Sequence, residues 1–250
     1  MEGSRRRSPI RIVCRAALIA AVACGCAAPR NHLYQKSGAE FQRAVVLPLN
    51  LVAAMPAELA DDAHRVDEAL LGYLAEHGKA IESIGYKDAL AAWRESESEC
   101  RSRAAKDCDK FAGVAPIMAQ HLRRDHDYQT LIIPYLRFHA ARTGSSAAKW
   151  DGVKRSVEKT GSGFGPDGPA RLVRGEVRAV SLKVFAFSAE GEKVFEGIGG
   201  LDLVDRLRAP GDGYQDYAVE VREDLFGDEH MVREGVELAL DGLVRRTAAN

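Results

Sequence analysis

The amino-acid sequence predicts a single α/β domain, in which amphipathic helices pack on a mixed β-sheet. Three observations lead to this prediction. In the first half of the 250-residue chain, short apolar runs alternate with helical patterns. The second half contains a long stretch of strand-like alternation, and the C-terminal segment returns to helical spacing. One large domain fits a chain of this length.

The first half of the chain is expected to begin with a strand and a helix. The segment RAVVLPLNLV at 43–52 is short, apolar and β-branched, and Pro48 is typical of a strand that leaves the sheet at that point. From Glu58 to His77 apolar residues recur at helical spacing, and Gly78 follows as a terminator.

Two further helices are expected around a second strand. KAIESIG at 79–85 has the length of a short strand, and the segment 86–98 places apolar residues on one side of a helix. A third helix is predicted over 110–124. Within it, Pro116 either kinks the helix or sets a late start at its first turn.

The second half of the chain is predicted to be antiparallel. DYQTLIIPYLRFHAAR at 127–142 is the strongest strand in the sequence and is expected at the centre of the sheet. An inserted ribbon is expected at about 143–170. Alternating residues at 176–204, around a turn at 189–192, predict a hairpin. The segment 228–247 predicts an amphipathic helix with its first residue, an aspartate, as the cap.

The amino terminus has the pattern of an export signal. An arginine-rich stretch at 1–15 precedes an uncharged stretch at 16–29, which is too short to cross a bilayer as a helix. We therefore expect residues 1–23 to be a cleaved signal peptide, residues 24–42 a flexible tether and residues 43–250 one domain.

Two cysteines close the uncharged stretch, and each follows a small residue. The segment resembles a bacterial lipobox, in which the cysteine after the cleavage point is acylated and becomes the first residue of the mature protein. Cys24 fits this pattern better than Cys26, because cleavage before Cys26 would leave a cysteine at the penultimate position of the signal. The resemblance implies a lipid anchor on the periplasmic face of the outer membrane. A plain secretory signal cut near Ala27 or Ala28 is the alternative.

Two other cysteines, Cys100 and Cys108, are expected to form a disulfide in an oxidising compartment. They lie in SECRSRAAKDCDKF, a charged stretch that is expected to link two helices. A bridge across so short a loop would stabilise the fold by about 2 to 3 kcal/mol. Metal ligation is the competing interpretation, but the sequence has no C-x-x-C pair and no nearby histidine to complete a tetrahedral set.

Three segments carry a resemblance to a group of bacterial periplasmic lipoproteins: AVVLPLN at 44–50, DYQTLIIPYLRF at 127–138 and KVFAFSAEGEKVFE at 183–196. With the lipobox and the terminal helix, their order is similar to that of curli-secretion lipoproteins, activators of penicillin-binding proteins and the amino-terminal domain of TolB. Those proteins share a mixed sheet similar to the anticodon-binding domain of tRNA synthetases. The resemblance implies a binding or assembly role at the envelope without a cofactor. The linker around Cys100 and Cys108 and the ribbon depart from the group.

Two segments of the sequence are candidates for a ligand-binding or catalytic site. Residues 163–168 match G-x-G-x-x-G, but two prolines remove backbone donors and a strand pattern follows, so a loop is predicted in place of a nucleotide site.

The second cluster is HLRRDHDY, which contains His121, Asp125, His126 and Asp127. The two histidines are five residues apart and do not share a helix face, which favours a solvated helix end over a metal or acid–base site. His139 is likewise expected to be a half-exposed residue with its polar atoms satisfied.

The ribbon contains Trp150, Asp151 and Gly152 in an otherwise polar insertion. A tryptophan on a projecting ribbon would suit a partner surface. A tryptophan that folds back onto the sheet is the alternative and the favoured interpretation, because large aromatic side chains dominate core packing.

The charge of the mature chain argues against nucleic acid as a partner. Residues 1–23 hold five arginines and one glutamate, so a protein that starts at Cys24 has 30 basic and 35 acidic residues. We expect a non-catalytic protein that attaches to the membrane through its lipid and binds an envelope partner. The partner could also be a second copy of the protein, bound through an exposed strand edge. The alternatives are a periplasmic hydrolase or transferase with dispersed catalytic residues, or a peptidoglycan- or small-ligand-binding module.

Overall fold

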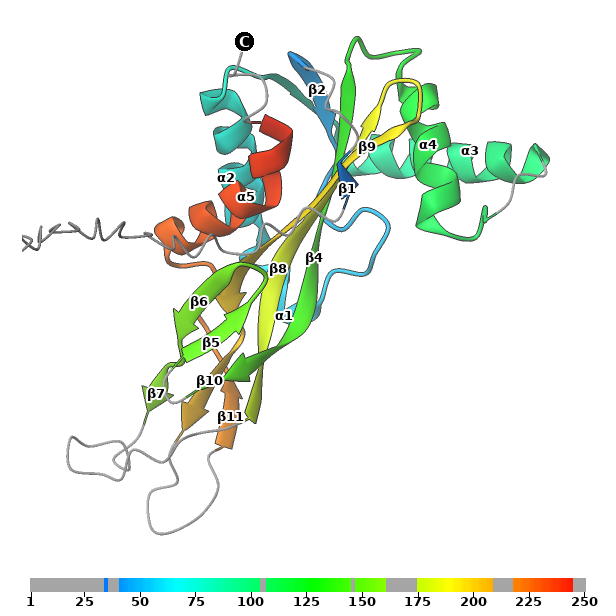
Figure 1. Ribbon diagram of the computed structural model, residues 1–250. Coiled ribbons are helices and arrows are strands. Elements are labelled where there is room, and N and C mark those ends of the chain that lie inside the picture. Colours follow the sequence, from blue (N-terminus) through cyan, green and yellow to red (C-terminus); the bar gives the residue numbers. More distant parts are fainter. Residues whose placement is uncertain are drawn as a thin grey trace, which may run out of the picture.

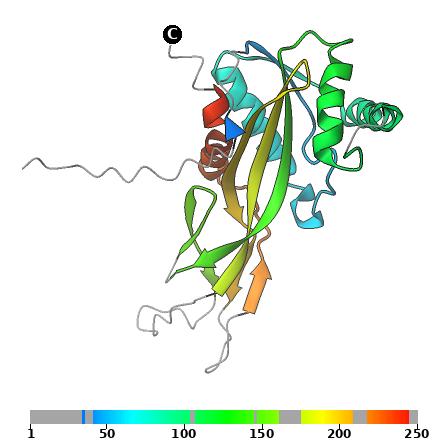
Figure 2. The ribbon, with the colours of Figure 1, turned by 45° about the vertical axis from the view of Figure 1, so that its right-hand side comes forward.

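The protein, described here from a computed structural model, is defined at residues 34–35, 41–103, 107–144, 147–160, 175–208 and 218–244. A mixed β-sheet forms its centre and helices cover both faces (Figures 1 and 2). This confirms the predicted α/β class. The helices are α1 (Ala57–Ala60), α2 (Ala63–Glu76), α3 (Tyr86–Ser102), α4 (Phe111–Leu122) and α5 (Glu229–Val244).

Eight strands form the main sheet in the order β1-β9-β8-β4-β2-β3, with β5 paired to β4 and β6 paired to β5. A second sheet has the order β11-β10-β7. In the main sheet β2 runs parallel to β3 and β4, whereas β8 is antiparallel to both of its neighbours, β4 and β9. The strands are β1 (Tyr34–Gln35), β2 (Arg43–Val46), β3 (Ala80–Ser83), β4 (Thr130–Thr143), β5 (Ala147–Trp150), β6 (Val153–Ser156), β7 (Lys159–Thr160), β8 (Gly175–Ser188), β9 (Lys193–Leu203), β10 (Asp205–Arg208) and β11 (Ala218–Val221).

The strand expected at the centre of the sheet is β4, and it lies between β2 and β8 as predicted. Its side chains alternate between two cores. Ile132 and Leu136 pack in the core beneath α2 and α5, whereas Leu131 and Ile133 pack in the core beneath α3 and α4. Figure 2 shows the two helix pairs on opposite sides of the sheet. Burial on both faces explains the continuous apolar sequence of β4.

Helix α5 lies against β9 at backbone contact distance. A Cβ atom added to Gly199 would lie 2.0 Å from the carbonyl oxygen of Gly235, and one added to Gly235 would lie 2.4 Å from the carbonyl oxygen of Gly200. Both glycines are therefore needed for the helix to approach the sheet. This close contact fixes α5 beside α2 on the same face of the sheet (Figure 1).

The predicted ends of two helices and the predicted hairpin turn are confirmed. Helix α2 stops before Gly78, which adopts a positive φ of 70°. The carboxylate of Asp228 accepts a hydrogen bond from the backbone N–H of Met231 at 3.1 Å and so caps α5. Strand β8 ends at Ser188 and β9 begins at Lys193, on either side of the predicted turn.

In the α3–α4 region one expectation was wrong, and one of the two alternatives for Pro116 is excluded. Helix α3 continues to Ser102, so Cys100 lies within the helix and not in a linker. Ion pairs between residues four apart, Glu97 with Arg101 and Glu99 with Arg103, support this charged last turn. Pro116 stands in the interior of α4, which excludes a late start there.

The predicted disulfide is present in the structure. Cys100 and Cys108 are bonded, and their Cα atoms lie 5.6 Å apart. Both side chains are buried with Ile117 of α4, so the bridge ties the end of α3 to the start of the next helix. The metal-ligation alternative for these two cysteines is therefore wrong.

The segment expected to be an unstructured tether contains a strand. Tyr34 and Gln35 form β1, which pairs antiparallel with Glu196 and Phe195 of β9. The edge of β9 supplies free backbone groups that an extended segment can bind, which explains a strand without any local strand pattern in its sequence.

Candidate functional site: a groove between α2 and α5

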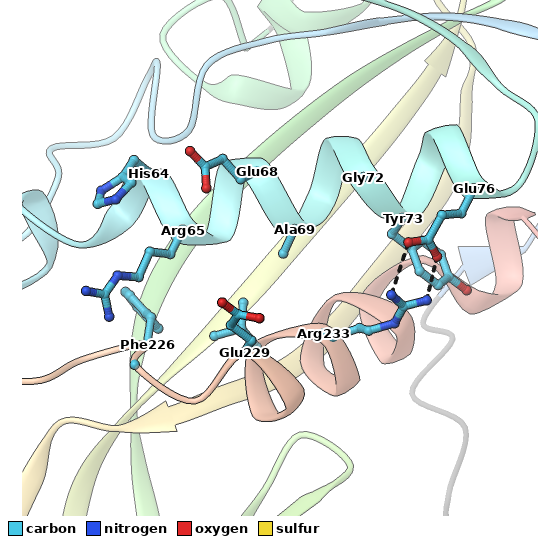
Figure 3. Close-up of a pocket in the computed structure, with 12 residues that line it drawn as sticks. His64, Arg65, Glu68, Ala69, Gly72, Tyr73, Glu76, Phe226, Glu229 and Arg233 are labelled. Carbon is cyan, nitrogen blue, oxygen red and sulfur yellow. Dashed lines mark hydrogen bonds and ion pairs between the residues drawn. The ribbon is translucent and has the colours of Figure 1, made fainter.

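A groove of about 670 Å³ lies between α2 and α5, and the loop that precedes α5 forms one of its ends (Figure 3). Its walls come from segments far apart in the sequence. The lining residues are His64, Arg65, Glu68, Ala69, Gly72, Tyr73, Glu76, Phe226, Gly227, Glu229, Val232 and Arg233.

Helix α2 contributes to the groove because its residues recur every three or four positions on one stripe. Arg65, Ala69, Gly72 and Glu76 form this stripe. It lies next to the buried stripe that packs on the sheet, which includes Leu70. The groove is therefore the uncovered shoulder of an amphipathic helix whose apolar face is already used in the core.

The floor of the groove is built from small and apolar residues. Ala69 and Gly72 come from α2, and Val232 comes from α5. Phe226, in the loop before α5, and Tyr73 are both largely buried in the core, so they expose little aromatic surface to the groove. This does not favour the aromatic-lined groove expected of a peptidoglycan-binding module.

Gly72 leaves open space in the floor. Beyond its own helix backbone, a Cβ atom added to Gly72 would have no heavy atom of the described residues within 4 Å. Glycine inside a helix is less stable than alanine by about 1 kcal/mol. Since no described residue comes close to this position, packing among the described residues does not account for a glycine here.

Two ion pairs neutralise part of the charge around the groove. Arg233 of α5 donates two hydrogen bonds to Glu76 of α2, one of them at 3.0 Å, and closes one end of the groove (Figure 3). These bonds to Glu76 raise the pKa of the Arg233 guanidinium. At the other end, Arg65 lies 3.4 Å from the carboxylate of Asp62, a residue outside the groove.

Two carboxylates remain, Glu68 on the α2 side and Glu229 on the α5 side. Both are exposed, and neither forms an ion pair with another residue in the described part of the chain. Glu229 lies in the first turn of α5, where a negative charge stabilises the helix dipole. Glu68 is in the middle of α2 and has no such role. The groove thus combines an apolar floor with the carboxylate of Glu229 between the helices and that of Glu68 at the outer rim of α2 (Figure 3).

His139, Asp151 and Ser181 form a second polar cluster, on the face of the sheet opposite α2 and α5. The Ser181 hydroxyl donates to Asp151 Oδ2 at 2.6 Å, and His139 Nε2 lies 2.9 Å from the same oxygen. Ser181 is fully buried. Because serine and histidine both meet the carboxylate and not each other, the cluster does not have the nucleophile–base arrangement of a hydrolase.

The effect of this cluster is to hold a hairpin turn on the sheet. Burial lowers the pKa of His139, although the neighbouring Asp151 carboxylate acts in the opposite direction. A carboxylate at the tip of the β5–β6 hairpin is thereby fixed to β4 and β8. Sequence reasoning did not join these three residues, because they come from three separate strands or turns.

Trp150 does not offer a partner surface. Its side chain is only 8% exposed, and its indole N–H donates to the carbonyl of Val180 at 3.3 Å. The neighbouring backbone carbonyl of Asp151 accepts from Gly200 N–H at 3.1 Å. A Cβ atom on Gly152 would lie 3.3 Å from Leu238 of α5. The hairpin folds back onto the sheet, which confirms the favoured interpretation of Trp150. A partner surface at Asp151 and Gly152 stays a prediction.

The histidines of HLRRDHDY lie apart and each meets a carboxylate from another element. His121 Nε2 lies 3.3 Å from Glu95, and His126 Nδ1 lies 2.7 Å from Glu82. The His121 side chain is 13% exposed, so the expected solvated helix end is wrong at that position. His126 also lines a shallow pocket of about 370 Å³ that does not include His139.

Two of the segments singled out in the sequence lie outside the residues that the structure describes. The G-x-G-x-x-G segment at 163–168 and the cysteines Cys24 and Cys26 lie outside the described residues. Within those residues no group of three or more potential metal ligands occurs. No helix in this part of the chain is long and apolar enough to span a bilayer.

The groove was not foreseen from the sequence. Its two walls are separated by about 150 positions, and a stripe beside a buried helix face looks like any solvated surface. The one usable signal was Gly72 within a strong helical pattern. No family model matches the chain, and neither a curated protein nor a solved structure resembles it significantly.

Proposed function

We propose that the protein is a lipid-anchored component of the bacterial envelope with a non-catalytic binding or assembly-accessory role. The observation that carries this proposal is the groove between α2 and α5. It is open, its floor is apolar, and two of its lining carboxylates, Glu68 and Glu229, form no ion pair among the described residues. Such a surface suits contact with another macromolecule.

The amino-terminal arrangement supports attachment to a membrane. Tyr34, the first residue of β1, is only ten positions after Cys24, with nine residues between them. At about 3.3 to 3.6 Å per residue, an acylated Cys24 would hold the domain within roughly 35 Å of the bilayer surface. A tether of this length raises the effective concentration of the domain near a membrane partner. The same reasoning applies to Cys26, with a tether two residues shorter.

The disulfide supports an exported location. Cys100 and Cys108 are bonded in the structure, and such bonds persist in the periplasm but are rare in the reducing cytosol. The outer-membrane location and the resemblance to curli-secretion, penicillin-binding-protein-activator and TolB-like domains remain predictions from the sequence.

Two measurements test the proposal. Mass spectrometry of the mature protein should find an acylated cysteine at the amino terminus, and Cys24→Ala should release the protein from the membrane fraction. An intact Met1 in a cytosolic fraction would contradict the location.

The binding role is tested by a photo-crosslinking residue placed at Ala69 in the groove, in cells. We expect a discrete adduct with an envelope protein. The same residue placed at Glu176, an exposed position at the far end of β8, is the matched control and should give none. Equal adducts from both positions, or none from Ala69, would count against the groove as the binding surface.

A further inference from the structure

We infer that the groove between α2 and α5 binds a segment of a protein partner in which a lysine or arginine stands next to an apolar side chain. This inference rests on the proposed binding role and names the chemistry of the partner. It follows from the open space above Gly72 and from the charge that the protein leaves uncompensated around it.

The apolar part of the inference comes from the floor. Gly72 is exposed in the centre of α2, and the space above it is empty of described atoms to 4 Å. Ala69 lies one turn before it (Figure 3), and Val232 of α5 also lines the groove. An apolar side chain of a partner would fill this space and remove the surrounding apolar surface from water.

The expectation of a basic side chain in the partner comes from the charges of the residues that line the groove. Glu76 is neutralised by Arg233, and Arg65 is paired with Asp62. Among the described residues, Glu68 and Glu229 form no ion pair; Glu229 lies between the two helices, whereas Glu68 lies at the outer rim of α2 (Figure 3). A cation that enters between the helices meets Glu229 and, at the rim, Glu68, whereas these two carboxylates repel an acidic segment.

The same charge disfavours other surfaces as occupants. The anionic headgroups of a bilayer and the phosphates of a nucleic acid would both be repelled by Glu68 and Glu229. A basic segment of a protein is therefore the occupant that the groove fits.

Binding of defined peptides to the full mature protein, purified in a neutral detergent, tests this inference. The probe is a fluorescent peptide of about four helical turns composed of leucine and lysine. One comparison peptide has glutamate in place of lysine, and another has serine in place of leucine. Fluorescence anisotropy at about 0.15 M salt gives each dissociation constant. We expect the leucine–lysine peptide to bind at least tenfold more tightly than either comparison peptide.

Variants of the protein locate the site. The double variant Glu68→Gln with Glu229→Gln should weaken binding of the leucine–lysine peptide roughly two- to thirtyfold, as expected for the loss of two exposed charge contacts. Gly72→Leu fills the floor and should weaken binding at least tenfold. Glu176→Gln removes an exposed carboxylate far from the groove and should leave the affinity unchanged. Thermal unfolding of each variant checks that the fold is retained. If Gly72→Leu does not fold, the double variant Glu68→Gln with Glu229→Gln still tests whether the peptide binds in the groove.

Defined results would overturn the inference. One such result is equal affinity of the double variant and the unchanged protein for the leucine–lysine peptide. Another is tighter binding of the glutamate peptide than of the leucine–lysine peptide to the unchanged protein. A chain that ends at Val244 tests a different occupant, because residues 245–250 begin with two arginines. A large gain in affinity for this shorter chain would assign the groove to the protein's own C-terminal segment. Concentration-dependent sedimentation that Gly72→Leu abolishes would assign it to a second copy.

The outcome is separable from the proposed function. If Ala69 crosslinks to an envelope protein but the peptides show no preference for lysine, the binding role stands and the basic-partner inference fails. If the peptides follow the predicted order but the mature protein is cytosolic, the inference about the groove stands and the envelope proposal fails.

Discussion

The same substitution at two helical glycines should have opposite effects on stability. Gly72 of α2 and Gly235 of α5 are both inside helices, so replacing either with alanine gains about 1 kcal/mol of helix propensity. At Gly72 the new methyl group meets no described atom within 4 Å. We therefore expect Gly72→Ala to raise the free energy of unfolding by the full amount, about 1 kcal/mol.

At Gly235 the methyl group meets the backbone of β9. It would lie 2.4 Å from the carbonyl oxygen of Gly200 and 2.7 Å from Leu201 Cδ2. Neither the strand nor the helix can relieve this contact by a side-chain rotation alone, so α5 must move away from the sheet. Overpacking of this kind costs about 1 to 3 kcal/mol and occasionally more. After the gain in propensity, we expect Gly235→Ala to lower the free energy of unfolding by up to about 2 kcal/mol.

Urea unfolding followed by circular dichroism measures both effects, with the slope of the transition checked for constancy. The two variants should differ by about 1 to 3 kcal/mol. In thermal unfolding, each kcal/mol corresponds to about 2 to 4 °C for a domain of this size. A destabilised Gly72→Ala would mean that the space above Gly72 is filled, and a stabilised Gly235→Ala would refute the close contact between α5 and β9.

Four further predictions concern the disulfide, two titrating groups and the hairpin. Replacing both Cys100 and Cys108 with alanine should lower the free energy of unfolding by about 2.5 kcal/mol in urea, and a reductant should then have no further effect. Because burial lowers the pKa of His139, the unfolded chain takes up this proton first, so stability should fall as the pH drops below the ordinary histidine value near 6.5. His139→Gln should flatten the dependence of the urea midpoint on pH between about 7 and 5; an unchanged slope would contradict this. Burial, and then Glu68, raise the pKa of Asp67, so its charge destabilises the fold above the ordinary value of 3.8. Asp67→Asn should raise the urea midpoint at neutral pH and lose this advantage in acid; equal gains at both pH values would point to another cause. Trp150→Ala should cost about 3 to 5 kcal/mol, and a loss below 1 kcal/mol would show that the hairpin is not packed on the sheet.

The sequence predicted elements whose signals are local. The apolar run of β4 indicated a central strand because both of its faces are buried. Gly78 marked the end of α2, since a positive φ is easy for glycine. Asp228 marked the start of α5 because its carboxylate can accept from the free backbone N–H groups there. Each of these depends on a few neighbouring residues.

Features that depend on distant residues were missed. The last turn of α3 looked like a linker because its residues are charged, and the bond to Cys108 that holds it is a tertiary contact. Strand β1 exists through pairing with the edge of β9, so its own two residues carry no pattern. Trp150 could be assigned to the core or to a surface from the sequence, and only the folded hairpin decides between them.

The two kinds of glycine separate structural from functional constraint in this protein. Gly199 and Gly235 allow α5 to contact β9, and that contact accounts for the missing side chains. Gly72 destabilises α2 and is needed by no described neighbour. A residue that lowers stability without improving the packing of its own chain is expected where function requires it. Gly72 stands in the floor of the groove that Glu68 also lines, so under the proposed binding role a ligand that approaches α2 there would account for this glycine.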